Sequence, residues 1–106
     1  MGPAEPGDPL PLENHMSDPR ERPVLIVTGG SRGIGAATAK LAAAQGWCVM
    51  TTYLGRAAAA AAIVEEIRMS GGEAAAMQVE IADESAVKRM FDVTKKTFGR
   101  VTGLVN

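Results

Sequence analysis

From Pro23 onward, short continuous runs of apolar residues alternate with longer segments in which apolar residues recur at helical spacing. The continuous runs predict strands, and the longer segments predict helices. Apolar runs without polar alternation are typical of parallel strands buried on both faces. The pattern predicts an α/β protein with right-handed βαβ units and a doubly wound parallel sheet of strand order 3-2-1-4. The expected strands are 24–28, 48–53, 74–81 and the start of a fourth at 103–106, and the expected helices are about 31–45, 57–70 and 84 to about 97.

Residues with special backbone or capping preferences mark the expected helix ends. Gly46 follows the first helix as a C-cap, and Gly71 and Gly72 follow the second. Asp83 stands where an N-cap of the third helix is needed. We expect the third helix to bury a stripe formed by Val87, Met90, Phe91, Thr94 and Phe98.

The first 22 residues differ in composition from the rest of the chain. All six prolines lie within residues 1–23, and residues 1–22 carry five acids and two bases without apolar periodicity. Such a segment cannot bury enough apolar surface to fold, so we predict a disordered acidic tail over 1–22 and a folded region over 23–106. The only histidine, His15, lies in this tail and is interpreted as a solvated side chain without a functional role.

Composition excludes several classes of function. Residues 23–106 have a net charge of +2 and the whole chain has few aromatic residues, which argues against a nucleic-acid surface. The single cysteine, Cys48, lies in an apolar run and is expected to be a buried, inert thiol. No metal site is predicted. Without a long apolar segment or signal-peptide core, the chain is expected to be soluble and cytoplasmic, without a membrane partner.

A glycine-rich stretch, Thr28–Gly35, joins the first strand to the first helix. Strand, glycine turn and helix in this order form a seat for a dinucleotide phosphate. Gly29 and Gly33 can adopt backbone angles that a Cβ atom forbids, and Gly35 permits a close approach of the helix. The free N–H groups and the dipole at the helix start, around Ile34, favour a pyrophosphate over a mere connecting turn.

The spacing of the glycines separates subtypes of this site. A GxGxxG reading from Gly33 fails because its last position is Thr38, and no Gly-Lys-Ser/Thr sequence indicates a Walker loop. Reading from Gly29 gives Thr-Gly-x-x-x-Gly-x-Gly, which resembles the motif of the short-chain dehydrogenase/reductase family. This spacing also disfavours a methyltransferase-type Rossmann domain.

Two further segments carry the same resemblance. Residues 80–83, Glu-Ile-Ala-Asp, resemble the family's Asp-Val segment, which implies that Glu80 and Ile81 hold the adenine ring. Glu80 departs from the usual Asp, and its reach is longer. Residues 98–106 resemble the run into the family's Asn-Asn-Ala-Gly motif, with Asn106 as the first Asn. The resemblance covers 23–106, the N-terminal portion of such a Rossmann-type domain, and is nearest to the 3-oxoacyl-carrier-protein reductase and glucose 1-dehydrogenase-like groups.

The residues around the turn favour NADP(H) over NAD(H). Tyr53 occupies the position where an acid would bind the ribose 2′-hydroxyl of NAD. In related family members a basic residue before the second motif glycine marks NADP preference, and Arg32 matches it, next to Ser31 in the same turn. Arg56 either adds a second guanidinium for the 2′-phosphate or simply faces solvent.

The resemblance implies hydride transfer between a nicotinamide and a small carbonyl or alcohol substrate. The family uses a Ser, a Tyr and a Lys in a Tyr-x-x-x-Lys arrangement, whereas Tyr53, the only tyrosine, is followed four positions on by Ala57. No catalytic residue is therefore assigned. We expect the chain to be an inactive N-terminal fragment or truncated gene model of a longer, homo-oligomeric enzyme, although a non-catalytic dinucleotide sensor of the same fold remains the alternative.

Overall fold

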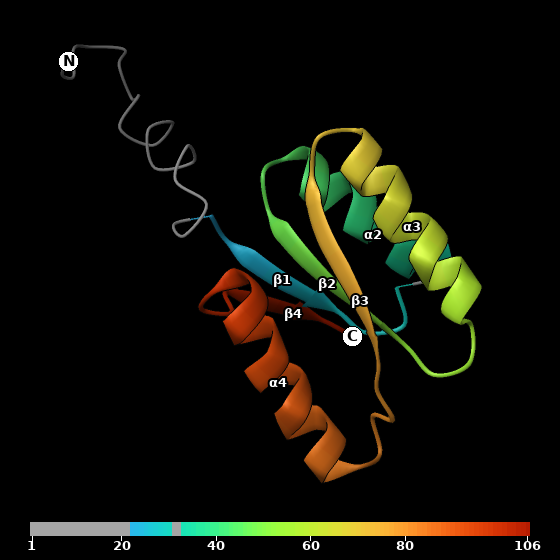
Figure 1. The fold of residues 1–106 in the computed structure, drawn as a ribbon, viewed down its shortest axis with the longest axis vertical. Coiled ribbons are helices and arrows are strands. Elements are labelled where there is room, and N and C mark those ends of the chain that lie inside the picture. The colour runs from blue at the N-terminus through green and yellow to red at the C-terminus, as the bar shows by residue number, and fades with distance from the viewer. Residues whose placement is uncertain (1–21, 31–32) are drawn as a thin grey trace, which may run out of the picture.

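The protein is described here as a computed structural model, which covers residues 22–30 and 33–106. Four parallel strands form one sheet in the order β3-β2-β1-β4, which confirms the predicted topology. Every crossover between them contains one helix (Figure 1). The strands are β1 (Val24–Val27), β2 (Cys48–Tyr53), β3 (Glu73–Gln78) and β4 (Gly103–Val105), and the helices are α2 (Gly33–Ala44), α3 (Ala57–Met69) and α4 (Glu84–Phe98).

The sheet is covered on both faces, so the molecule has three layers (Figure 1). Helices α2 and α3 lie on one face, and α4 lies on the other. Successive strand residues point to opposite faces, so neighbours in β1 enter different cores. Leu25 and Val27 pack on the α2 and α3 side, while Ile26 packs with Met50 and Met90 on the α4 side. Burial on both faces explains why these strands read as continuous apolar runs.

The end of β3 is the largest departure from the predicted boundaries. We predicted a strand over 74–81, but β3 ends at Gln78. Its neighbour β2 ends at Tyr53, whose carbonyl accepts one more bond, from the Val79 N–H at 2.9 Å. Glu80 and Ile81 then have no strand to pair with, so they form part of a turn. The other predicted boundaries agree or differ by at most two residues, which is the usual scatter at element ends.

Helix α4 begins with the predicted cap and is only partly buried along the predicted stripe. The Asp83 carboxylate accepts N–H bonds from Ser85 at 2.9 Å and Ala86 at 3.3 Å. Met90 and Thr94 are buried, but Phe91 is exposed, so its place in the buried stripe was wrong. One helix alone covers this face of the sheet (Figure 1).

Cys48 is buried at the start of β2, as expected. Burial raises the pKa of its thiol above the ordinary value, and this effect exceeds the opposing influence of the Arg22 guanidinium. The thiol is therefore mostly protonated near neutrality and is a poor nucleophile.

Two of the sequence predictions lie outside the described residues. These are the structure of the tail, including His15, and the positions of Ser31 and Arg32. Among the helices that the structure describes, none combines the length and apolar character needed to cross a bilayer.

The Asp83 cap yields a test of helix stability. Asp83→Ala leaves the two N–H groups without a side-chain acceptor, and caps of this kind contribute about 1 kcal/mol. The melting temperature, measured by circular dichroism at 222 nm, should fall by about 4–8 °C for a domain of this size. Asp92→Ala removes the same charge from an exposed position within α4 and serves as the control. Equal losses for both variants would show that charge, and not capping, is responsible.

Candidate dinucleotide-binding site

The turn between β1 and α2 requires glycine for two different reasons. Gly29 and Gly33 have φ angles of 69° and 63°, in the left-handed region that disfavours other residues. Gly35 has an ordinary φ, but a Cβ there would lie 2.6 Å from the Gly29 carbonyl oxygen and 2.9 Å from the Gly30 Cα. Its close approach is thus to the backbone of the turn itself.

Gly30 is also sterically required, and sequence reasoning missed it. A Cβ at this position would collide with the hydroxyl oxygen of Thr51 and would lie 3.1 Å from a methyl group of Val27. The sequence contains no direct signal for this contact, because it depends on the register that pairs Val27 of β1 with Thr51 of β2.

Strand β2 also anchors the turn by a hydrogen bond. The Gly29 N–H donates to the Thr52 hydroxyl oxygen at 3.3 Å, and both Thr51 and Thr52 are buried. The sequence pattern places these threonines in a strand and not among the predicted site residues. Two hydroxyl side chains at the carboxyl end of an otherwise apolar strand are the feature that could have indicated a contact with the turn.

Asn106 lies directly beside the start of the turn. The Thr28 hydroxyl donates to the Asn106 side-chain oxygen at 2.7 Å, and the Thr28 N–H donates to the Val105 carbonyl at 2.9 Å. The C-terminal end of the described chain therefore lies next to the end of β1 (Figure 1). Two residues that are 78 positions apart in sequence are joined at one point.

Tyr53 and Arg56 flank the loop after β2. Tyr53 is half-buried, and Arg56 is exposed just before α3 without a side-chain capping bond. The loop is held from β3, because the Gln78 side-chain amide donates to the Leu54 carbonyl at 2.9 Å. Gln78 was not singled out from the sequence, where it is simply a polar residue at a strand end.

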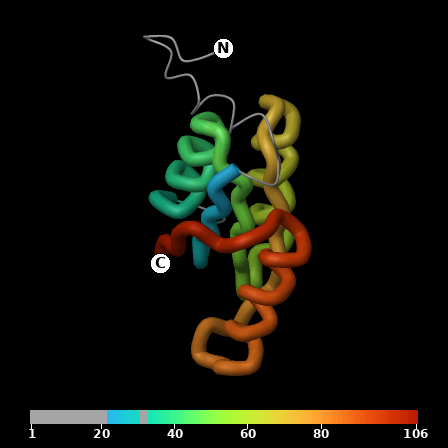
Figure 2. The backbone as a smooth tube through the Cα atoms, turned by 90° about the vertical axis from the view of Figure 1, so that its left-hand side faces the viewer, coloured from blue at the N-terminus to red at the C-terminus, as the bar shows by residue number. Residues whose placement is uncertain are grey.

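Glu80 and Ile81 follow β3 in an exposed loop. One Glu80 carboxylate oxygen accepts the Ala82 N–H at 3.1 Å, and the Glu80 carbonyl accepts the Asp83 N–H at 2.9 Å. The Ile81 side chain is exposed. Figure 2 shows this loop and the first turns of α4 projecting beyond the sheet and the other two helices.

The predicted site residues that the structure describes all lie at or after the carboxyl ends of strands. Because the strands are parallel, these ends share one edge of the sheet, and this is the edge where ligands bind in open α/β sheets. Thr28 and the glycines follow β1, Tyr53 ends β2 and Arg56 follows it, Glu80 and Ile81 follow β3, and Asn106 follows β4. The arrangement offers N–H groups, hydroxyls and apolar contacts along the edge, which can hold an extended ligand.

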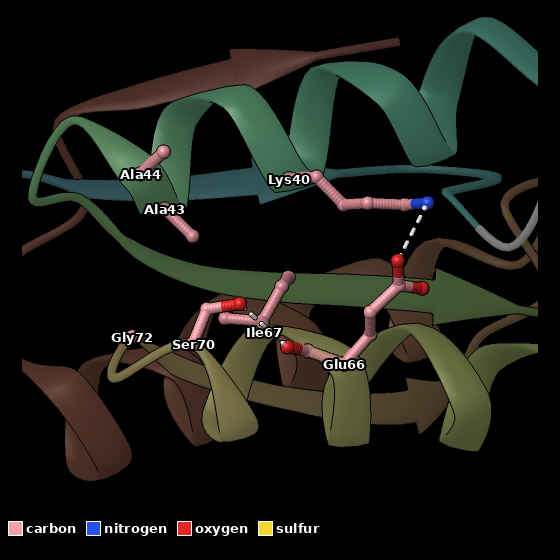
Figure 3. Close-up of a pocket in the computed structure, with 7 residues that line it drawn as sticks. All are labelled: Lys40, Ala43, Ala44, Glu66, Ile67, Ser70 and Gly72. Carbon is pink, nitrogen blue, oxygen red and sulfur yellow. Dashed lines mark hydrogen bonds and ion pairs between the residues drawn. The ribbon is translucent and has the colours of Figure 1, made fainter.

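A well-defined hollow of the described surface lies elsewhere, between α2 and α3 (Figure 3). Lys40 and Glu66 form an ion pair across it at 3.3 Å, and both side chains are substantially exposed. Exposed pairs of this kind contribute little to stability. The remaining lining is mostly small, formed by Ala43, Ala44, Ile67, Ser70 and Gly72, and we regard the hollow as a groove between packed helices.

Comparisons with known proteins agree with this geometry. The chain is 45% identical over 83 residues to a 3-oxoacyl-[acyl-carrier-protein] reductase of Synechocystis. The matched region covers 78% of this chain and 34% of the relative. Among solved structures, a short chain dehydrogenase of Burkholderia cenocepacia in complex with NADP is 46% identical, with a TM-score of 0.75 over 80% of this chain and 34% of that one. A dehydrogenase/reductase of Sinorhizobium meliloti is 38% identical, with a TM-score of 0.78 over 89% and 38% of the two chains.

The chain thus spans about a third of the length of the curated relatives it matches. The family model described as short chain dehydrogenase matches residues 23–106. Every segment that carries a predicted site residue falls within this match. The chain therefore belongs to the short-chain dehydrogenase/reductase family.

Proposed function

We propose that residues 23–106 are the NADP(H)-binding N-terminal part of an oxidoreductase that transfers hydride between a nicotinamide and a small carbonyl or alcohol substrate. Residues 1–22 are a tail outside this domain. The observation that carries the proposal is the geometry of the glycine turn at the carboxyl edge of the sheet, where Gly35 lies against Gly29 and Gly30. It is supported by a relative named as a reductase and by another whose structure contains NADP.

The pyrophosphate would lie at the start of α2. A helix of 12 residues beginning at Gly33 presents unpaired N–H groups and a positive dipole end there. The Ile34 side chain in the first turn is 84% exposed. Covering such an apolar side chain with a ligand lowers the free energy of the complex, which supports a contact with the bound dinucleotide.

The adenosine end would lie between the loops after β2 and β3. Exposed Ile81 offers an apolar contact to the adenine ring. One Glu80 oxygen already accepts the Ala82 N–H, and the second oxygen of that carboxylate would accept from the adenine amino group. Tyr53 and Arg56 would face the ribose.

The 2′-phosphate would be recognised by arginine. No carboxylate stands at Tyr53 to repel it, and Arg32 and Arg56 belong to the two loops that flank its expected position. A guanidinium binds phosphate bidentately, so NADP(H) should be preferred to NAD(H).

The bound nicotinamide would supply the hydride. The residues of this chain would bind and orient the dinucleotide, and none is proposed to move a proton on the substrate. A second candidate function is a non-catalytic dinucleotide sensor. Tyr53 has Ala57 and not a lysine four positions on, so it does not match the family's catalytic tyrosine, and dinucleotide binding is the step that the residues of this chain support under either function.

Arginine recognition can be tested by titrating the chain with NADPH and NADH while following the cofactor fluorescence. Arg32→Ala should raise the Kd for NADPH by about tenfold or more, because a charge-assisted hydrogen bond contributes roughly 1.5–3 kcal/mol. The Kd for NADH should change less than twofold. Arg100→Ala is the control, since Arg100 precedes β4 at the opposite edge of the sheet. Equal losses of both cofactors in Arg32→Ala would remove the basis for NADP preference.

The close approach at Gly35 gives a second test. Gly35→Ala would force the turn and the helix start apart, and overpacking of this kind costs about 1–3 kcal/mol. We expect NADPH binding at least about tenfold weaker, as measured by the same titration. Gly72→Ala is the matched control, because a Cβ there also makes a close contact, 2.8 Å from a methyl carbon of Ile67, but Gly72 precedes β3 at the opposite ends of the strands. Unchanged affinity in Gly35→Ala would contradict a pyrophosphate seat at this turn.

A further inference from the structure

Thr51 is a buried residue with an unexplained hydroxyl. Its exposed fraction is 0%, and within residues 22–30 and 33–106 its hydroxyl oxygen has no hydrogen-bond partner. The other two buried threonines differ, since Thr52 accepts the Gly29 N–H and Thr94 donates to the Met90 carbonyl at 2.7 Å. A buried polar group without a partner is destabilising, so its presence calls for an explanation.

The Thr51 hydroxyl faces Gly30. An ideal Cβ at Gly30 would collide with this oxygen, and it would lie 3.3 Å from the Thr51 Cβ. The oxygen is therefore the part of the side chain nearest to the turn. A hydroxyl is smaller than a methyl group, so a valine would press further into the space next to Gly30.

Thr51 and Thr52 together support two successive residues of the turn. Because neighbouring strand residues point to opposite faces, the two threonines reach the turn from different sides. Thr52 bonds Gly29 and Thr51 lies against Gly30. Gly35 in turn lies against both glycines, so a series of contacts connects β2 to the first turn of α2.

We propose that Thr51 is a positioning residue of the dinucleotide site, whose hydroxyl sets how closely Gly30 approaches β2 and thereby where the start of α2 stands. The proposal rests on the proposed function. Thr51 is buried beneath the turn and acts on the ligand only through Gly30 and Gly35. Because its hydroxyl has no hydrogen-bond partner among the described residues, it acts at this contact through its size.

The proposal predicts opposite effects of two substitutions on affinity and stability. Thr51→Val adds bulk next to Gly30, so the Kd for NADPH should rise by about tenfold. The melting temperature should change little, because the cost of the added bulk is offset by removal of a buried hydroxyl that has no partner among the described residues. Thr51→Ser keeps the oxygen and loses a buried methyl group. Its Kd should stay within about twofold of the wild-type value, while its melting temperature falls by about 4 °C.

Thr94→Val is the matched control for burying an apolar group in place of a hydroxyl. Thr94 is equally buried but lies on α4, where it is satisfied by Met90. This variant should lose thermal stability and keep its affinity for NADPH. All variants are measured in the full chain, by cofactor fluorescence and by circular dichroism melting.

A double-mutant cycle tests the contact itself. Gly30→Ala should weaken NADPH binding, and Gly30→Ala/Thr51→Ala should recover part of the loss because the colliding oxygen is gone. The effects of the substitutions at positions 30 and 51 on the free energy of NADPH binding should therefore be non-additive. Additive losses would overturn the proposed contact. If Gly30→Ala does not fold, the comparison of Thr51→Val with Thr51→Ser decides.

Two results would overturn the proposal while leaving the proposed function intact. One is an unchanged Kd in Thr51→Val. The other is a loss of affinity in both Thr51 variants that follows the loss of melting temperature, which a purely structural role would produce. A wild-type chain that melts cooperatively but binds neither NADPH nor NADH would instead overturn the proposed function, and this inference with it.

Discussion

The close contact of backbone with backbone in the turn between β1 and α2 is the constraint on which the other features depend. Gly35 can lie against the backbone of Gly29 and Gly30 only because it carries no side chain, since a Cβ there would lie 2.6 Å from the Gly29 carbonyl oxygen. This contact fixes the direction in which α2 leaves the sheet. The helix then covers one face, and its N-terminal N–H groups point to the edge where the other strands also end. Both the packing of α2 on the sheet and the shape of the candidate site therefore depend on the close backbone contact at Gly35.

The sheet supports the turn from both neighbouring strands. On one side β2 supplies two threonines, and on the other β4 supplies the Val105 carbonyl, and Asn106 directly follows it. Strand β1 lies between them, buried on both faces. A central strand held in this way has little freedom, so the loop that follows it starts from a fixed position.

The sequence predicted the elements and the strand order, because strands buried on both faces and glycines at the turns leave clear patterns. It failed where a contact depends on register. The end of β3 depends on where β2 stops, and the need for glycine at position 30 depends on which residue of β2 lies opposite. Neither of these is encoded in a local pattern. The contact of Asn106 with Thr28 agrees with the family resemblance, which carries information about distant pairings that spacing alone does not.

The bond between Thr28 and Asn106 has a consequence for the order of assembly. A turn formed near the beginning of the folded region is held by Asn106, which directly follows β4, across a separation of 78 positions. Pairing at such long range is slow, because the loop-closure entropy is lost before the contact forms. During synthesis on a ribosome, the glycine turn would emerge well before its β4 partner. A nucleotide that binds more tightly when β4 is paired with β1 would then stabilise the paired sheet over any state in which β4 is still detached.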